Sequence, residues 1–398
     1  MELDFAPGLE DFREEVRTWL AEHIVGEFAA HRGVGSPTDD TAWDLRVEWE
    51  RELSAGRWLG LTWPEEFGGR GLGLAEEIVF EYEYARAAAP ARVNTQALEL
   101  LGPTLLACGT HEQKSRFLPK ILKVEEMWGQ GFSEPGAGSD LADVRTRAVL
   151  DDGGVWHIDG QKIWTTFGHH ADWLYVLCRT NPDVALRHRG LSLLLVDARQ
   201  DGVEIRPIEN INRSTEFSEC FFNDARSTAD LTVGEIDGGW SVVMTTLGLE
   251  RGSALMPVQL GMERELSSII DIARRNGSLD DPDIRQRLVD AYIGTKLMRS
   301  TNLRVVADLL NEDSPDPGAA TAAAAMTTKL FASTQHQKMG ELAMDILGFA
   351  GLFETGDPLD DVSTVQKLFL SSRAETIYGG TSEIQRNIAA ERVLGLPR

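Results

Sequence analysis

Apolar residues recur at helical spacing from the start of the chain. Leu9, Val16 and Leu20 fall on one face of an expected amphipathic surface helix, with Arg13 and Arg17 on its outer face. The same period predicts further helices over 43–53, 75–88, 93–108 and 112–124. This pattern predicts an N-terminal all-α domain over residues 1–125.

The period changes after Trp128. Short apolar runs separated by turn residues predict strands or strand ends at 147–150, 155–158, 173–178, 191–196, 203–207 and 220–222. Asp152-Gly153-Gly154 and Asp159-Gly160 are expected to form the turns of hairpins. A compact antiparallel β-domain is therefore predicted over residues 126–236.

The helical period returns at Gly238. Long helices are expected at about 240–275, 283–311, 321–347, 362–375 and 382–393, with Pro257 interrupting the first. They predict a C-terminal four-helix bundle over residues 237–398. The fold class is thus α+β and multidomain, with a helical, a β and a second helical part.

Composition and charge narrow the class of partner. The 398 residues include 63 acidic and 39 basic side chains, for a formal net charge of −24. Such a chain repels nucleic acid, so an anionic cofactor has to be held by local arginines and helix N-termini. Without a basic leader or an apolar run of about 20 residues, we expect a cytoplasmic protein with no signal peptide and no membrane insertion.

The few candidates for metal or thiol chemistry are weak. Cys108, Cys178 and Cys220 lie far apart without metal-ligand spacing, so reduced buried thiols are expected. His169-His170 lacks a carboxylate or cysteine partner at suitable spacing. We expect a polar loop there and no metal site.

Two segments carry candidate chemistry for binding a ring-bearing polar ligand. Residues 128–140 read WGQGFSEPGAGSD, in which Gly136 and Gly138 let a ligand approach the backbone between two serines. Residues 160–166 read GQKIWTT and place an indole and two hydroxyls on an expected strand. A glycine-rich turn alone is usually only a turn, but the two segments together are much rarer by chance.

These segments resemble the flavin-binding middle domain of the acyl-CoA dehydrogenase family. Residues 376–386, TIYGGTSEIQR, are similar to the C-terminal signature of that family, and 63–69, WPEEFGG, to its N-terminal one. The four motifs stand in family order and cover nearly the whole chain. The resemblance implies FAD-dependent α,β-dehydrogenation of an acyl-CoA thioester, with electrons passed to an electron-transfer flavoprotein.

The resemblance also implies roles for residues of the middle domain. Phe132 and Ser133 would present backbone and hydroxyl groups to the flavin pyrimidine, and Ser139 would lie near the pantetheine of the substrate or a flavin phosphate. Trp164 would pack on the isoalloxazine, and Thr166 would donate a hydrogen bond to flavin N5, the atom that receives hydride.

The base takes an uncommon place in the chain. Many family members carry the catalytic glutamate directly after the signature tyrosine, but here Gly379 follows Tyr378. A subset places it on the first bundle helix before an arginine, as in Glu250-Arg251. We expect Glu250 to be the base, Gly379 to offer its backbone amide to the thioester oxygen, and Arg251 and Tyr378 to face the substrate. The alternative for Glu250 is an ordinary helical ion pair.

The residues expected to reach a neighbouring subunit's flavin are partly altered. Arg275 and Gln286 are in place, but Ser278 stands where the family has phenylalanine, and Asp345 aligns with a glutamine that reaches the same FAD.

Thr381 and Glu383 hold signature positions that usually help to bind FAD. The pattern leaves open a homotetramer or a heteromer with a second acyl-CoA dehydrogenase-like chain. Such heteromers include bacterial members that act on steroid side chains.

Rival functions are a non-catalytic subunit that completes the flavin site of a partner, and a same-fold flavin oxidase or monooxygenase. The acyl group is not identified by the sequence. Gly248, Gly252 and Gly379 suit either a bulky or branched acyl group or close helix packing.

Overall fold

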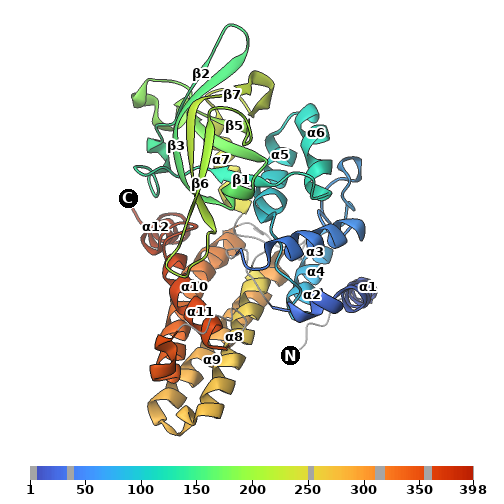
Figure 1. Ribbon diagram of the computed structural model, residues 1–398, viewed down its shortest axis with the longest axis vertical. Coiled ribbons are helices and arrows are strands. Elements are labelled where there is room, and N and C mark those ends of the chain that lie inside the picture. Colours follow the sequence, from blue (N-terminus) through green and yellow to red (C-terminus); the bar gives the residue numbers. More distant parts are fainter. Residues whose placement is uncertain (1–6, 34–39, 250–254, 310–318, 354–360, 398) are drawn as a thin grey trace. The chain divides into compact units, whose positions relative to one another are not determined.

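The protein is described by a computed structural model that covers residues 7–33, 40–249, 255–309, 319–353 and 361–397 (Figure 1). These residues divide into two compact units. The bundle unit holds the described residues of Met1–Leu20, Leu74–Ala88 and Arg251–Arg398, and the sheet unit holds those of Ala21–Gly73 and Ala89–Glu250. The N-terminal helices are thus shared between the units, and the three-domain division at 125/126 and 236/237 stays a prediction.

The sheet unit is built on an eight-stranded sheet in the order β6-β7-β3-β2-β4-β5-β8, with β1 paired to β4. Its strands are β1 Trp128–Gly131, β2 Arg147–Leu150, β3 Val155–Thr166, β4 Trp173–Arg179, β5 Leu191–Asp197, β6 Val203–Ile208, β7 Phe217–Thr228 and β8 Thr232–Val233. Pairing is antiparallel except between β4 and the two strands β1 and β2, which run parallel to it. The sheet is therefore mixed at that point, which the expectation of an antiparallel domain did not include.

The hairpin predicted at Asp159-Gly160 is wrong. β3 runs through these residues, and its pairing with β7 shifts register between Ile158 and Gly160. Gly160 has a φ of +153°, and a Cβ there would lie 2.6 Å from the Cα of Thr146. The glycine is needed because Thr146, just before the paired strand β2, comes close to it, and not because the chain reverses.

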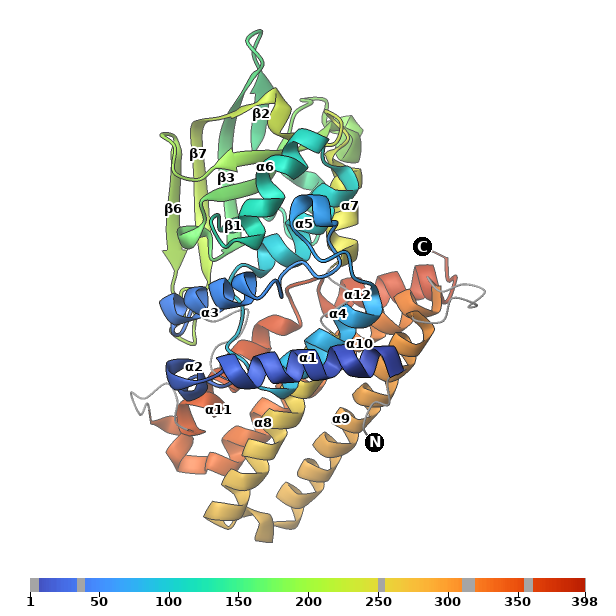
Figure 2. The ribbon, with the colours of Figure 1, turned by 90° about the vertical axis from the view of Figure 1, so that its right-hand side faces the viewer.

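Helices pack beside this sheet, and Figure 2 shows α5, α6 and α7 near its strands. The helices of the sheet unit are α2 Gly26–Ala30, α3 Trp43–Ala55, a π-helical turn Gln96–Leu101, α5 Gly102–Cys108, α6 His111–Leu122 and α7 Gly239–Leu249. α6 begins with a capping box between Thr110 and Gln113. The hydroxyls of Thr104 on α5 and Thr246 on α7 lie 2.9 Å apart in the interior, which ties the end of α7 to α5.

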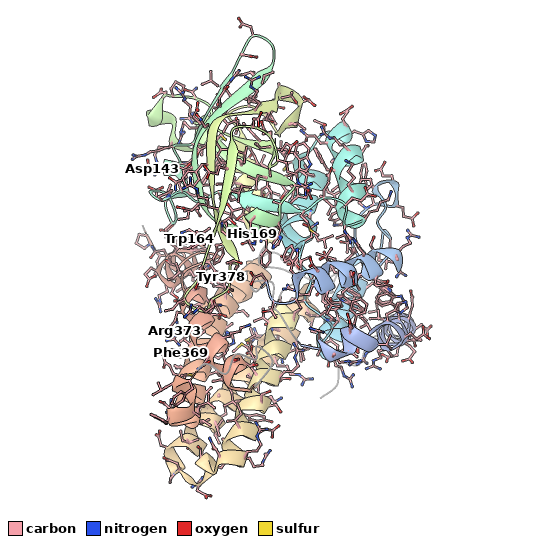
Figure 3. The ribbon with its side chains drawn as sticks, viewed as in Figure 1. Asp143, Trp164, His169, Phe369, Arg373 and Tyr378 are labelled. Carbon is pink, nitrogen blue, oxygen red and sulfur yellow. The ribbon has the colours of Figure 1, made fainter. Side chains whose placement is uncertain are left out.

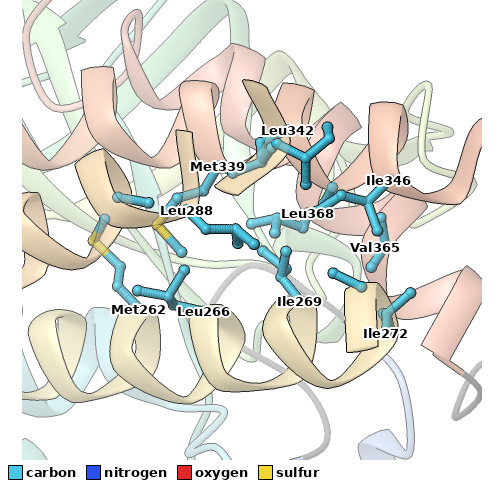
Figure 4. Close-up of a cluster of buried hydrophobic side chains, with 14 of the residues drawn as sticks. Met262, Leu266, Ile269, Ile272, Leu288, Met339, Leu342, Ile346, Val365 and Leu368 are labelled. Carbon is cyan, nitrogen blue, oxygen red and sulfur yellow. The ribbon is translucent and has the colours of Figure 1, made fainter. Parts of the chain in front are cut away.

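The bundle unit confirms the expected four-helix bundle. Its helices are α1 Pro7–His23, which runs on into the sheet unit, α4 Leu74–Arg86, α8 Leu255–Asn276, α9 Pro282–Leu309, α10 Ala319–Leu347, α11 Asp361–Glu375 and α12 Ser382–Ile388, the last followed by a π-helical turn Ala389–Val393. The core of α8 to α11 is shown in Figure 4 and includes Met262, Ile269, Leu288, Met339 and Leu368. Burial of these side chains stabilises the bundle by the hydrophobic effect.

One helix face differs from its prediction. Arg13 of α1 was expected on the outer face, but it is buried, and its Nε donates to Glu83 Oε1 of α4 at 2.6 Å. Arg17 Nε donates to the other oxygen of Glu83 at 3.0 Å. Helical periodicity shows which residues share a face, but it does not reveal a buried acidic partner 70 residues away.

Across the described ranges, no helix is long and apolar enough to cross a membrane.

Candidate functional site

Trp164 is held outward by a bulge in β3. The register of β3 against β7 shifts between Lys162 and Thr165, and Trp164 has a φ of +64°. Trp164 (labelled in Figure 3) stays 54% exposed. The ring of Phe217 of β7 packs edge to face on it, with centroids 5.7 Å apart. A bulky residue in the left-handed region costs about 1–3 kcal/mol, so such strain points to a functional constraint.

The segment after β1 forms a tight turn with an accessible backbone. Glu134 and Ala137 exchange two backbone hydrogen bonds of 2.9 and 3.0 Å around Pro135-Gly136. A Cβ built at Gly136 or at Gly138 would meet no atom within 4 Å. The bend expected at Glu134-Pro135 is confirmed, and the two glycines leave open space beside the chain.

Strand β3 and this turn are joined directly. The amide of Ile163 donates to the Ser133 carbonyl at 3.0 Å, and the ring of Phe132 is buried edge to face on Tyr175. Among the described residues, the hydroxyls of Ser133, Ser139 and Thr166 have no hydrogen-bond partner. The sheet unit therefore gathers an exposed indole, open hydroxyls and an uncovered backbone turn. We call residues 132–139 and 164–166 the cradle.

A buried ion pair lies beneath the cradle. Lys162 is fully buried, and its Nζ donates to Glu134 Oε1 at 2.8 Å and to the Phe132 carbonyl at 3.0 Å. The other contacts of Glu134 are the amides of Arg145 and Thr146 at 2.7 and 2.8 Å. Burial opposes ionisation of Glu134, but Lys162 and these amides outweigh it and hold the pKa of the carboxyl below its usual value.

This pair was not predicted. Lys162 lies in the quoted GQKIWTT segment, where no role was assigned to it. Its signal in the sequence is its spacing: Ile158 and Lys162 are four apart on a strand and so face the same side, which is the buried side. A lysine in an inward position requires an acidic partner.

The C-terminal signature begins with a loop, residues 376–381, between α11 and α12 in the bundle unit. We call it the signature loop. Gly379 and Gly380 have φ of +60° and +87°, and their carbonyls accept from Gln385 Nε2 at 2.9 Å and Lys329 Nζ at 2.7 Å. Tyr378 is exposed. Within the described residues, the amide of Gly379 has no acceptor, which leaves that N–H open to a ligand.

The next signature residues begin a helix. Thr381 caps α12 by accepting from the Ile384 amide at 3.2 Å, so the hydroxyl already has a structural role. Glu383 is exposed in the first turn, 3.8 Å from Arg386.

The positions expected to reach a partner's flavin lie on the surface of the bundle unit. Arg275 and Gln286 are exposed, and Gln286 Nε2 donates to Asp290 at 3.0 Å. Asp345 pairs with Arg287 at 2.8 Å, so its charge is balanced within the chain. Ser278 Oγ lies 3.4 Å from the Ile346 carbonyl, near the end of α10.

The expected base is outside the described part of the chain. Glu250 and Arg251 fall between α7 and α8, among residues 250–254, as does Gly252. Val243, seven residues before Glu250, is fully buried on α7.

Three family descriptions match successive parts of the chain. They are the N-terminal domain of acyl-CoA dehydrogenase over residues 7–125, the middle domain over 129–225 and the C-terminal domain over 237–394. The chain belongs to the acyl-CoA dehydrogenase family. It is therefore an oxidoreductase, and FAD is the cofactor of its family.

Related dehydrogenases match over the full length. Acyl-CoA dehydrogenase IpdE1 of Mycobacterium tuberculosis is 49% identical over 391 residues, 98% of either chain. A structure titled "Tcur3481-Tcur3483 steroid ACAD" is 32% identical with a TM-score of 0.85, and the ChsE4-ChsE5 complex of Mycobacterium tuberculosis is 28% identical with a TM-score of 0.82. Both cover 100% of each chain. The predicted family and fold class are confirmed.

The cradle residues fit the flavin of this acyl-CoA dehydrogenase. The exposed Trp164 ring offers an apolar face to a flat ring system, and the open hydroxyls and turn backbone offer hydrogen bonds. The roles of single residues, including Phe132, Ser133, Ser139, Trp164 and Thr166, stay predictions.

The two adjacent histidines lie in a short 3-10 turn, Gly168–His170, between β3 and β4, and they are half-buried. The His170 ring stacks on Trp43 with centroids 3.9 Å apart, and His169 Nδ1 lies 3.1 Å from Ser218 Oγ. Burial lowers the pKa of both, that of His170 to about 4, so both are neutral at pH 7. They line a hollow of about 360 Å³ together with Arg199 and Ile205. No group of three His, Cys, Asp or Glu suited to a metal occurs among the described residues.

The three cysteines differ in burial. Cys178 and Cys220 are buried, as expected, and burial raises their pKa to about 12 and about 11, so neither is a ready nucleophile. Cys108 is only partly buried, against the expectation, since it lies in the last turn of the short helix α5.

Proposed function

We propose that the chain catalyses α,β-dehydrogenation of an acyl-CoA thioester, with Glu250 removing the α-proton. Bound FAD would accept the β-hydrogen as hydride at N5 and pass the electrons to an electron-transfer flavoprotein. The observation that carries the proposal is the cradle, where a strained bulge exposes Trp164 beside open hydroxyls. Strain of this kind is expected where a side chain has to meet a ligand.

The signature loop supports a role for Gly379. Its open amide can donate to the thioester oxygen as negative charge develops there, and the bonded carbonyls of Gly379 and Gly380 fix the orientation of the loop. A glycine at this position has no carboxylate, so the base has to come from elsewhere in the chain. Glu250 is the expected source, because it stands before Arg251 as in the subset of the family.

Glu250→Gln tests the base. The variant should keep FAD binding and lose flavin bleaching by acyl-CoA by about 100- to 10,000-fold, the usual contribution of general base catalysis. Glu263→Gln is the matched control, because Glu263 lies on α8 and pairs with Lys296 of α9, and this variant should bleach at the wild-type rate. Bleaching at an undiminished rate in Glu250→Gln would remove it from the role.

The acyl group that we propose is bulky. Gly248 has open space where a Cβ would stand, and a Cβ at Gly379 would meet only Lys329 Cε, at 3.9 Å. One solved structure with a full-length match is titled "Tcur3481-Tcur3483 steroid ACAD". Anaerobic bleaching with straight-chain, branched and steroid-bearing acyl-CoAs should be fastest with the last. Equal rates with short straight chains would contradict a bulky pocket.

A heteromer is the second candidate for how the protein works. Two of the related structures have titles that name two different chains. On α9 the apolar residues Val289, Ile293 and Leu297 are half-exposed and follow each other at helical spacing, and Gln286 continues the same outward face. We infer that this face meets another chain of the same fold, with Gln286 directed to the flavin of that partner. Full FAD occupancy in a homogeneous single-chain assembly would favour a homotetramer.

A further inference from the structure

A histidine stands between two carboxylates at the base of the signature loop. His336 of α10 has Nε2 2.8 Å from Glu265 Oε2 of α8 and Nδ1 2.7 Å from Glu375 Oε1, the last residue of α11. The three side chains are mostly buried, and His336 is only 15% exposed. These contacts join three helices of the bundle immediately before the loop begins.

The geometry fixes the charge of His336. A neutral imidazole carries one N–H, so one ring nitrogen would meet a carboxylate lone pair to lone pair. Both distances are those of charge-assisted hydrogen bonds, which requires an imidazolium that donates from both nitrogens. Consistent with this, burial alone would lower the pKa of His336, but Glu265 and Glu375 raise it to about 10.

The same side of α10 holds the loop from both ends. His336 and Gln337 follow Lys329 by seven and eight residues, so the three side chains lie on one face of α10. Gln337 Nε2 donates to Thr376 Oγ1 at 3.2 Å, directly after Glu375, and Lys329 bonds the Gly380 carbonyl. The amide of Tyr378 donates back to the Ala374 carbonyl at 3.0 Å. Gly379 therefore lies between two residues, Thr376 and Gly380, that are both hydrogen-bonded to α10.

Close packing against α10 restricts the movement of α11. A Cβ at Gly340 would lie 2.9 Å from the Phe369 Cα, so α10 and α11 are in close backbone contact there. Arg373 donates to Glu341 at 2.8 Å and to the Gln337 carbonyl at 3.0 Å. Phe369, Arg373 and Tyr378 mark this line along α11 and into the loop in Figure 3.

We propose that Glu265, His336 and Glu375 form a charged clamp whose function is to position the Gly379 amide for the thioester oxygen. His336 is a positioning residue, since it acts through Glu375 and the loop. The inference rests on the proposed function for the role of the amide, but the clamp itself can be measured without any substrate. Loss of the cation would leave two carboxylates facing each other across a buried site, and Glu375 would move away together with the loop.

Amide hydrogen exchange of the full chain tests the clamp. His336→Gln should exchange at least about tenfold faster in peptides spanning 374–382, while peptides of α9 keep the wild-type rate. Glu341→Gln is the matched control, because Glu341 lies on α10 like His336, pairs with Arg373 of α11 in an exposed position, and leaves the clamp intact. Wild-type exchange at 374–382 in a folded His336→Gln protein overturns the proposal.

Glu375→Gln covers the case in which His336→Gln fails to fold. It keeps the pair of His336 with Glu265, so the bundle should stay intact while the loop exchanges faster. Wild-type exchange in this variant also overturns the proposal.

Kinetics then separate positioning from simple stability. If the amide acts mainly in the transition state, kcat with the best acyl-CoA should fall about 10- to 100-fold in His336→Gln while KM changes less than about threefold. Fast exchange with an unchanged kcat would contradict the positioning role. Fast exchange in a protein that no acyl-CoA bleaches, even as wild type, would instead contradict the proposed function and leave the clamp standing.

Discussion

At the scale of single residues, the Lys162–Glu134 pair shows how a polar group determines the shape of a binding surface. Lys162 neutralises Glu134 and also donates to the carbonyl of Phe132, so both hydrogen-bond acceptors of its ammonium group belong to the cradle. A hydrophobic side chain of the same length could fill the space but could not hold that carbonyl. The pair therefore orders the backbone that the flavin is expected to meet.

Lys162→Met should be strongly destabilising. It leaves the Glu134 carboxylate buried without its cation, a change that costs about 3–5 kcal/mol in other buried pairs. Urea unfolding should show this loss, and titration of the apoprotein with FAD should show a weaker dissociation constant. Arg147→Met is the control, because Arg147 pairs with Asp159 at the surface of the same sheet and should cost about 1 kcal/mol or less.

The double variant Lys162→Met with Glu134→Gln sharpens this test. With no charge left, it should lose less stability than the sum of the two single variants. Additive losses would show that the two residues act separately.

Residue identity alone predicted much of the cradle but not what lies beneath it. Trp164, Ser133 and Thr166 could be picked out because the two short segments that hold them are rarely found together by chance. The Glu134 partner of Lys162 could not, since it lies 28 residues earlier and the turn that brings it back depends on tertiary packing. The outer-face position predicted for Arg13 was wrong for the same reason, because its partner Glu83 lies far away in the sequence.

At the scale of elements, the long helices agreed with their hydrophobic period, whereas β3 did not agree with its turn signal. Asp159-Gly160 has the composition of a hairpin turn, and Gly160 does have a positive φ. Only the pairing of β3 with β7 and the nearness of Thr146 show that the strand runs on through this glycine.

Gly160→Ala should therefore damage the sheet itself. The new Cβ would stand 2.6 Å from a backbone atom of Thr146, so β2 or β3 has to shift, and we expect a loss of about 1–3 kcal/mol by urea unfolding. Gly136→Ala makes the contrast, because nothing lies within 4 Å of its Cβ. It should keep stability within about 0.5 kcal/mol and weaken FAD binding if the turn backbone meets the cofactor. Equal stability of the two variants would contradict the close approach of Thr146 as the reason for Gly160.

The clamp predicts a pH dependence of the bundle. Since the pKa of His336 is raised to about 10 from an ordinary value of 6.5, the stability that Glu265 of α8 and Glu375 of α11 give is full below pH 6.5 and is lost as the pH rises toward 10. The urea midpoint of the wild type should fall between pH 7 and pH 9.5. In His336→Gln, the fall should be smaller over the same interval, and an identical fall would assign it to other groups.

At the scale of the whole molecule, the chain has surfaces that its own residues do not cover. We predicted from the family resemblance that the positions of Ser278 and Asp345 reach the flavin of a neighbouring subunit, and both residues depart from the family pattern; Asp345 is already paired with Arg287. The cradle carries no such departure. Some residues of such a chain would bind its own flavin, and others would contact the flavin of a neighbouring subunit. A chain that keeps the first set and alters the second is expected where the neighbour is a different protein.

The apolar face of α9 makes this testable without knowledge of the substrate. Leu297 is 56% exposed, so Leu297→Asp should leave the bundle folded by circular dichroism, because the side chain points away from the core. If the face meets another chain, the new charge should break the assembly, seen as a lower mass by light scattering. Ser268→Asp adds the same charge to an exposed site on α8 and should keep the mass. An unchanged mass for Leu297→Asp would place the interface elsewhere. A monomeric wild type with little FAD would instead mean that this face binds a different chain. Co-expression could then identify that chain, because the right partner should restore both the mass of the assembly and its flavin content.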